Sequence, residues 1–315
     1  MRKCLLALLL TAMVAMPAAA QDKRKAIASF SILADIVRQV GGEHVEVATL
    51  VPAGGDGHVY QPSPADARAV AGADILISNG LNFETWLDRL VQASGFKGTR
   101  IVASEGIPPR RLKDDGHKHD HDHKPGQKHD HGAADIDPHV WHDLTRMRRY
   151  VANIAEGLAK ADPQHAEEYR KRAAAYTAQL DALDIWAKAA FDAIPRAQRK
   201  AITQHDAFGY LADRYQIEFL APQGMNTETE ASAENVARLV RQIKRERVQA
   251  LFFENIINPR LIEQIAKEAK VKVGGRLYSD SLSVPGSEAG SEADSFLKLF
   301  RVNVERLADA MRRES

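Results

Sequence analysis

The chain alternates short apolar segments with amphipathic segments, and this alternation constrains its fold more than any other feature. In the first half, segments rich in β-branched residues predict strands, and segments with apolar residues every three or four positions predict helices. The predicted strands are 25–30, 45–51, 75–78 and 100–103, and the predicted helices are 34–40, 65–71 and 83–93. Strands that alternate with helices indicate a parallel sheet, and therefore an α/β fold.

The second half repeats this order of elements. Residues 201–213 can be laid beside 26–35, because each consists of a short strand, a break and a helix. A helix at 232–245 and a strand at 248–253 then follow, as they do within 65–78. A chain of 315 residues also exceeds the usual size of one domain, so we expect two lobes of similar construction.

One long helix is predicted between the two halves. Asp162 is a good N-cap, Pro163 suits the first helical position, and apolar residues recur at spacings of four and three until Pro195. At about 1.5 Å per residue, the helix spans roughly 45 Å. A coiled-coil partner is the alternative, but a seam of Ala and Tyr is a poor zipper, so a rigid connecting helix is favoured. The predicted domains are an N-terminal lobe at 21–160, the connecting helix at 161–195 and a C-terminal lobe at 196–315.

Residues 1–20 have the pattern of a secretory signal peptide. Arg2 and Lys3 precede an apolar run, and Ala18 and Ala20 supply the small residues of a cleavage site. The apolar run is too short to span a bilayer, and no stop-transfer pattern follows, which argues against the alternative of a membrane anchor. We therefore expect cleavage after Ala20 and a periplasmic protein.

Charge and cysteine content narrow the function further. The net charge is +1 and the basic residues are scattered, which argues against a nucleic-acid partner. The only cysteine, Cys4, lies in the predicted signal peptide. The mature protein would then have no thiolate, and nitrogen and oxygen atoms would have to hold any metal.

Six of the twelve histidines lie between residues 117 and 131, in a segment that also contains several aspartates. The surrounding stretch, 115–132, is polar and contains Pro125 and three glycines, which predicts a mobile loop. Imidazole with nearby carboxylate suits zinc, copper or nickel. We interpret the loop as a loose metal collector, the alternative being a solvated linker.

The other histidines include candidates for an ordered metal site. His58 follows the second predicted strand, His205 follows the strand at 201–204, and Asp280 follows a short strand-like segment. In open α/β sheets, ligands bind outside the carboxyl ends of the strands. By contrast, His44 and His165 are predicted to be ordinary surface residues.

His139 and His142 both lie at the start of a predicted helix, in the segment Asp137-Pro-His-Val-Trp-His-Asp143. Their spacing of three could place both on one helical face, but Pro138 marks the helix entry. We favour His139 alone as a ligand.

The chain resembles the zinc/manganese solute-binding proteins of ABC importers (the cluster A-I or cluster 9 family) in three motifs. They follow in the family's order and are His58-Val-Tyr60-Gln-Pro62, Asp137-Pro-His139-Val-Trp141 and Thr203-Gln-His205-Asp-Ala-Phe208-Gly-Tyr210. A histidine-rich loop between the first two is typical of the zinc members. The resemblance implies two (β/α)4 lobes with parallel sheets, joined by one long rigid helix, and a metal in the cleft between the lobes.

The resemblance also implies the ligand set, namely His58 and His139 from the first lobe and His205 and Asp280 from the second. Manganese members carry a carboxylate where His205 stands, so three histidines favour zinc. The implied function is a high-affinity periplasmic zinc receptor, not an enzyme, that is monomeric and delivers Zn²⁺ to an ABC permease in the inner membrane. A periplasmic zinc chaperone is a further candidate partner, and weaker zinc sites are expected in the histidine-rich loop.

Two other functions compete with this interpretation. A zinc hydrolase would need an open coordination position and a general base, and the sequence contains no His-Glu-x-x-His helix. A zinc chaperone or buffer without a transporter is the second alternative. The segment 222–231 is a candidate flap beside the site, and its Glu228 and Glu230 are, with His142, reserve candidates for the fourth ligand.

Overall fold

The structure is a computed structural model that describes residues 23–111 and 136–312, apart from 226, 230, 249, 288 and 289. The predicted signal peptide and the histidine-rich segment 115–132 lie outside the described residues. Within the described residues, no helix is long and apolar enough to cross a membrane.

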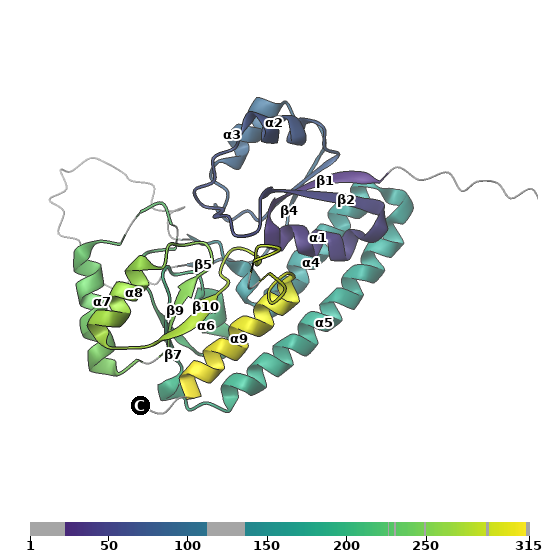
Figure 1. Cartoon of the computed structure of the whole chain (residues 1–315). Coiled ribbons are helices and arrows are strands. Elements are labelled where there is room, and N and C mark those ends of the chain that lie inside the picture. Colours follow the sequence, from purple (N-terminus) through teal and green to yellow (C-terminus); the bar gives the residue numbers. More distant parts are fainter. Residues whose placement is uncertain are drawn as a thin grey trace, which may run out of the picture.

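The first lobe is built on a parallel four-stranded sheet with the order β2-β1-β3-β4 (Figure 1). Its strands are β1 (Arg24–Phe30), β2 (Val45–Val51), β3 (Ile75–Ser78) and β4 (Thr99–Val102). Its helices are α1 (Ser31–Gly41), α2 (Pro64–Ala71), α3 (Leu87–Ser94) and α4 (Leu144–Ala161). The α/β alternation predicted from the sequence is therefore confirmed.

The second lobe has its own parallel sheet, with the order β10-β9-β7-β8. Its strands are β7 (Lys200–Ile202), β8 (Glu218–Leu220), β9 (Ala250–Glu254) and β10 (Val273–Leu277). Its helices are α6 (Gly209–Tyr215), α7 (Ala233–Glu246), α8 (Arg260–Ala269) and α9 (Phe296–Arg312). A short antiparallel pair, β5 (Arg110–Arg111) and β6 (Ile136–Asp137), precedes α4.

The long helix α5 (Ala166–Asp192) runs from one lobe to the other and packs against α1, α4 and α9 (Figure 1). Its start differs from the prediction, because Pro163–His165 form a 3-10 turn and Asp162 does not cap α5. The Asp162 carboxylate instead pairs with His165 Nδ1 and accepts a hydrogen bond from the Tyr169 hydroxyl, at 2.6 and 2.7 Å. The carboxylate is thus already engaged by side chains of the first turns.

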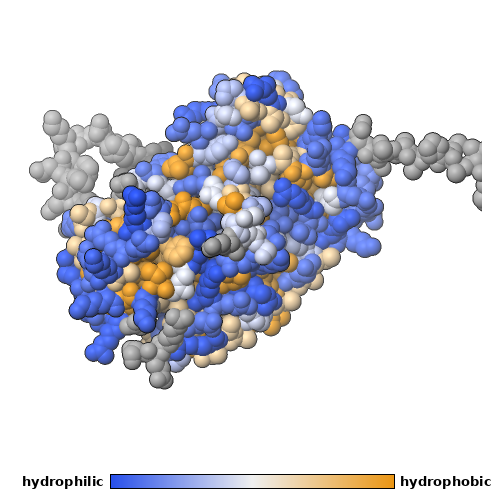
Figure 2. Space-filling model, in the orientation of Figure 1, coloured by the Kyte–Doolittle hydropathy of each residue, from blue (hydrophilic) through white to orange (hydrophobic). Residues whose placement is uncertain are grey.

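One apolar core extends across both lobes. It includes Phe30 and Trp141 from the first lobe and Phe208 and Tyr278 from the second, all at most 1% exposed. A smaller apolar cluster lies beneath α7 and α8. The lobes therefore share part of their hydrophobic interior. The face of the molecule seen in Figure 2 is mostly hydrophilic and carries smaller hydrophobic areas.

A buried polar contact also joins α5 to the second lobe. Asp184 of α5 accepts hydrogen bonds from the guanidinium of Arg214 and from the Tyr215 hydroxyl, both at the end of α6. Burial alone would raise the pKa of Asp184, but these hydrogen bonds outweigh it and lower the pKa. The ionised carboxylate is consequently the form that stabilises the folded state.

We predict that Asp184→Asn lowers the free energy of unfolding by about 2 kcal/mol at pH 7, because charge-assisted hydrogen bonds are lost in a buried place. Because the pKa of Asp184 is lower in the folded state, the difference from wild type should shrink as the pH falls below about 4. Urea unfolding of the metal-free protein measures both effects.

The control is Asp181→Asn on the same helix, whose pair with Arg148 is exposed. It should cost less than about 0.5 kcal/mol. Equal losses at the two positions would contradict the assignment of Asp184 as a link between α5 and the second lobe.

Candidate metal centre

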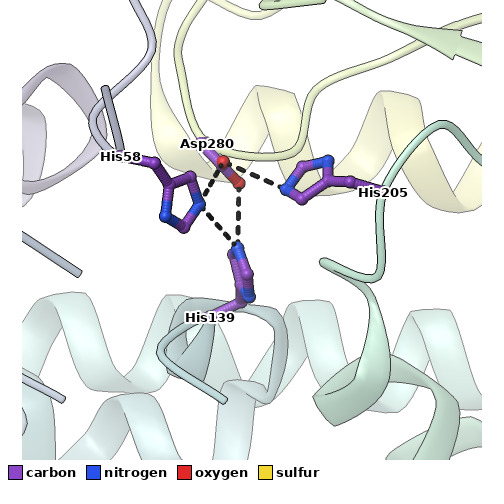
Figure 3. Close-up of side chains that lie close together, drawn as sticks. All are labelled: His58, His139, His205 and Asp280. Atoms are coloured by element: carbon purple, nitrogen blue, oxygen red, sulfur yellow. Dashed lines mark hydrogen bonds and ion pairs between the residues drawn. The ribbon is translucent and has the colours of Figure 1, made fainter. Parts of the chain in front are cut away.

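Four side chains, from the segments that follow β2, β6, β7 and β10, converge on one another (Figure 3). His58, His139, His205 and Asp280 are at most 4% exposed, and one donor atom of each lies within 4.8 Å of the others. The structure therefore brings together the four residues that the sequence analysis selected.

His58 lies in the loop that follows β2. Its backbone N–H donates to Asp56 Oδ1 at 2.9 Å, and its ring meets the ring of Phe83 edge-on, with centroids 4.7 Å apart. Gly57 is required here, because a Cβ at that position would lie 2.6 Å from the Phe83 ring. Burial, the largest influence, lowers the pKa of His58, which favours the neutral ring that a metal needs.

His139 follows β6 and precedes a 3-10 turn, Val140–His142. Its Nδ1 donates a hydrogen bond to Asp137 Oδ1 at 2.8 Å. The other oxygen, Asp137 Oδ2, accepts a hydrogen bond from Arg110 Nη1 at 3.2 Å. A carboxylate on Nδ1 fixes the ring orientation and leaves Nε2 free to face the cluster.

His205 follows β7, and its Nδ1 lies 2.6 Å from Glu254 Oε2. The other Glu254 oxygen accepts the backbone N–H groups of Gln204 and His205, at 2.7 and 2.9 Å. Burial would lower the pKa of His205, but Glu254 and Asp280 outweigh burial and raise the pKa well above its ordinary value. Without a metal, this raised pKa favours the imidazolium form of His205.

Asp280 follows β10 and carries the negative charge of the cluster. Burial would raise its pKa, but His205 and His139 lower the pKa well below its ordinary value. Within the described part of the chain, neither carboxylate oxygen has a hydrogen bond of normal geometry. A buried, ionised carboxylate is stabilised by nearby positive charge, which an imidazolium or a metal ion can supply.

The spacing of the donor atoms fits a small tetrahedral metal. His58 Nε2 lies 3.3 Å from His139 Nε2 and 3.2 Å from Asp280 Oδ2. Asp280 Oδ1 lies 3.6 Å from His139 Nε2, and Asp280 Oδ2 lies 3.3 Å from His205 Nε2. Bonds of about 2.0–2.1 Å in a tetrahedron separate neighbouring donors by about 3.3 Å, which is close to the separations of His58 Nε2 from His139 Nε2 and of Asp280 Oδ2 from His58 and His205.

His142 lies outside the cluster, although it is fully buried. Its Nε2 donates to the backbone carbonyl of Ser279 at 3.0 Å, and Trp141 Nε1 donates to the same oxygen at 2.8 Å. Burial lowers the pKa of His142 to about 3, so this ring stays neutral. Two side chains of the first lobe thus hold the residue next to Asp280 in the second lobe.

Sequence reasoning missed the carboxylates that support the ligands, namely Asp56, Asp137 and Glu254. Asp137 could have been noticed because it lies two residues before His139, close enough for its carboxylate to contact the His139 ring. Glu254 could have been noticed as an acid at the end of a strand that is otherwise apolar.

Thr227 of the candidate flap contacts the first lobe. Thr227 Oγ1 donates to Asp56 Oδ2 at 2.6 Å, and Asp56 is the residue that holds the backbone of His58. Glu228 is exposed and is not part of the four-residue cluster, and Glu230 lies outside the described residues.

Comparison with known proteins places this arrangement in context. Residues 27–310 match the family described as zinc-uptake complex component A, periplasmic. The manganese ABC transporter substrate-binding lipoprotein PsaA of Streptococcus pneumoniae is 30% identical over 92% of this chain and 89% of its own length. The manganese-binding lipoprotein MntA of Bacillus subtilis is 28% identical over 93% of this chain and 91% of its own.

A solved structure, the periplasmic zinc binding protein TroA from Treponema pallidum, superposes with a TM-score of 0.81 at 27% identity. The match covers 93% of this chain and 100% of the other. It confirms the predicted fold of two α/β lobes joined by a long helix.

Proposed function

We propose that this chain, which belongs to the family of the periplasmic zinc-uptake complex component A, is the zinc receptor of an ABC importer. The observation that carries the proposal is the convergence of three imidazoles and one carboxylate in a buried cluster between the lobes. In this proposal, His58, His139, His205 and Asp280 bind one Zn²⁺, which the protein delivers to a permease of the inner membrane.

The donor set supports zinc as the cargo. Three imidazole nitrogens and one carboxylate oxygen suit tetrahedral Zn²⁺, whereas manganese prefers more oxygen ligands. Relatives named for manganese and for zinc both resemble this chain, so the choice of metal depends on these four residues.

A receptor explains the cluster better than an enzyme does. Four protein donors fill a tetrahedral zinc ion, while a hydrolase needs an open position for water and a general base beside it. A periplasmic buffer without a transporter is the remaining alternative, and family membership favours transport.

The arrangement also suggests how the metal is released. His58 and His139 belong to the lobe at 21–160, and His205 and Asp280 belong to the lobe at 196–315, with the connecting helix at 161–195 between them. A shift of either lobe's loops would break the set of four donors, so the loaded and empty forms would differ at the cleft. The permease could then distinguish the two forms.

We predict that His139→Ala and Asp280→Ala each weaken zinc binding at least tenfold, or by about 1.4 kcal/mol, because each removes one donor of the tetrahedron. His142→Leu should leave the affinity within about threefold of wild type, since Trp141 still holds the Ser279 carbonyl. Competition with a chromophoric chelator measures all three affinities. A larger loss from His142→Leu than from His139→Ala would mean that His142 is the ligand.

Zinc binding should release protons, because the raised pKa of His205 favours its imidazolium form in the absence of metal. A raised pKa means that the proton is bound at pH 7, so zinc must displace about one proton there and more at lower pH. The apparent affinity should therefore fall steeply between roughly pH 7 and 5. Calorimetry in buffers of different ionisation enthalpy counts the protons.

Glu254→Gln is the matched test of the origin of this proton. It removes the charge beside His205 Nδ1 but keeps an oxygen for the backbone N–H groups. Fewer protons should be released at pH 7 than in wild type. Absence of proton release from the wild type would argue against His205 as a ligand.

Deletion of 115–132 should remove only weak zinc sites and leave one tight site, because the four clustered residues lie outside that segment. Calorimetric titration of the mature protein with and without the segment gives the stoichiometry. Loss of tight binding upon deletion would identify the histidine-rich loop as the primary site.

A further inference from the structure

A second group of side chains that could hold a metal ion lies apart from the four-residue cluster. Glu43, His44 and Glu168 each place a donor atom within 4.8 Å of the other two. Glu43 and His44 belong to a 3-10 turn, Gly42–His44, that precedes β2, and Glu168 lies in the first turn of α5. None of the three takes part in the centre described above.

The two groups are well separated. His44 directly precedes β2, whereas His58 lies in the loop that follows it. The seven residues of β2 at about 3.3 Å each place the groups roughly 20 Å apart, at opposite ends of the first sheet. A cation at the second group would therefore bind independently of the cleft.

The imidazole of His44 is held in a defined orientation. Its ring stacks on the ring of His165, with centroids 3.7 Å apart and an interplanar angle of 13°. His165 is fixed in turn by Asp162, which also accepts from Tyr169. The His44 side chain is only 16% exposed, and its Nε2 lies 2.8 Å from Glu168 Oε2. Such support lowers the entropic cost of presenting the nitrogen to a ligand.

We propose that Glu43, His44 and Glu168 form a second, weaker Zn²⁺ site. This site would join the turn that precedes β2 to the start of α5. Two carboxylates balance the charge of the dication, and one imidazole supplies the nitrogen that zinc prefers over calcium or magnesium. Zinc replaces the proton on His44 Nε2, the proton leaves to solvent, and water completes the coordination.

The surroundings explain why this site is weaker than the cleft. Glu43 is exposed and the Glu168 side chain is 53% exposed, so solvent competes for the ion. Arg172, one turn further along α5, packs over Gly42 and places a positive charge near Glu168. A bound ion would still crosslink two segments that are distant in sequence, and would stabilise the folded state by mass action.

The experiment follows the ring nitrogens of His44 by NMR in the full mature protein, loaded first with one equivalent of zinc. Further zinc should shift the His44 signals in a saturable manner, and this shift, which is separate from the weak sites expected at 115–132, defines the second step. Glu168→Gln should weaken this second step at least tenfold. The matched control, Glu167→Gln, removes the same charge from an exposed neighbour outside the group and should leave the step unchanged.

Arg172→Gln should have the opposite effect on affinity. Removal of the positive charge near Glu168 should strengthen zinc binding in the second step several-fold. The proposal fails if His44 does not respond to millimolar zinc. It also fails if Glu168→Gln and Glu167→Gln change zinc binding equally. The group would then be only an ion pair between His44 and Glu168, with His44 stacked on His165. Neither result would affect the tight site in the cleft, which is loaded before the measurement.

Discussion

The buried charge of Asp280 is the constraint on which the rest of the cleft depends. Its carboxylate oxygens lie 3.2 Å, 3.6 Å and 3.3 Å from nitrogens of His58, His139 and His205, so positive charge beside it stabilises the ionised form. In the empty protein, the imidazolium of His205 supplies that charge, with Glu254 behind it. A metal ion can take over the same role with twice the charge.

Much of the architecture could be predicted because local and global preferences agree. The predicted strands 45–51 and 75–78 match β2 and β3 residue for residue, since both are apolar, β-branched segments bounded by turns. Helix starts were less predictable. The structure begins α1 at Ser31, without a side-chain cap, and begins α3 at Leu87 instead of residue 83. Neither helix has the side-chain N-cap that would have marked its start in the sequence.

For the site, the rule that ligands gather at the carboxyl ends of strands selected His58, His205 and Asp280, and the structure groups them with His139. The choice of His139 over His142 depended on Pro138, and the structure agrees in placing only His139 in the cluster. The supporting carboxylates could not be derived in the same way. An acid that serves a histidine fifty residues away, as Glu254 serves His205, leaves no local pattern in the sequence.

The absence of sulfur from the cleft cluster has a consequence for the conditions under which the protein can work. A thiolate ligand is converted to sulfenic acid or a disulfide by peroxides, and it then loses its metal. Imidazole and carboxylate do not enter that sequence of reactions. A centre made of His58, His139, His205 and Asp280 would thus keep its ligands intact under oxidative stress. Its vulnerability is to acid instead, so proton concentration, not redox potential, would set the limits of its environment.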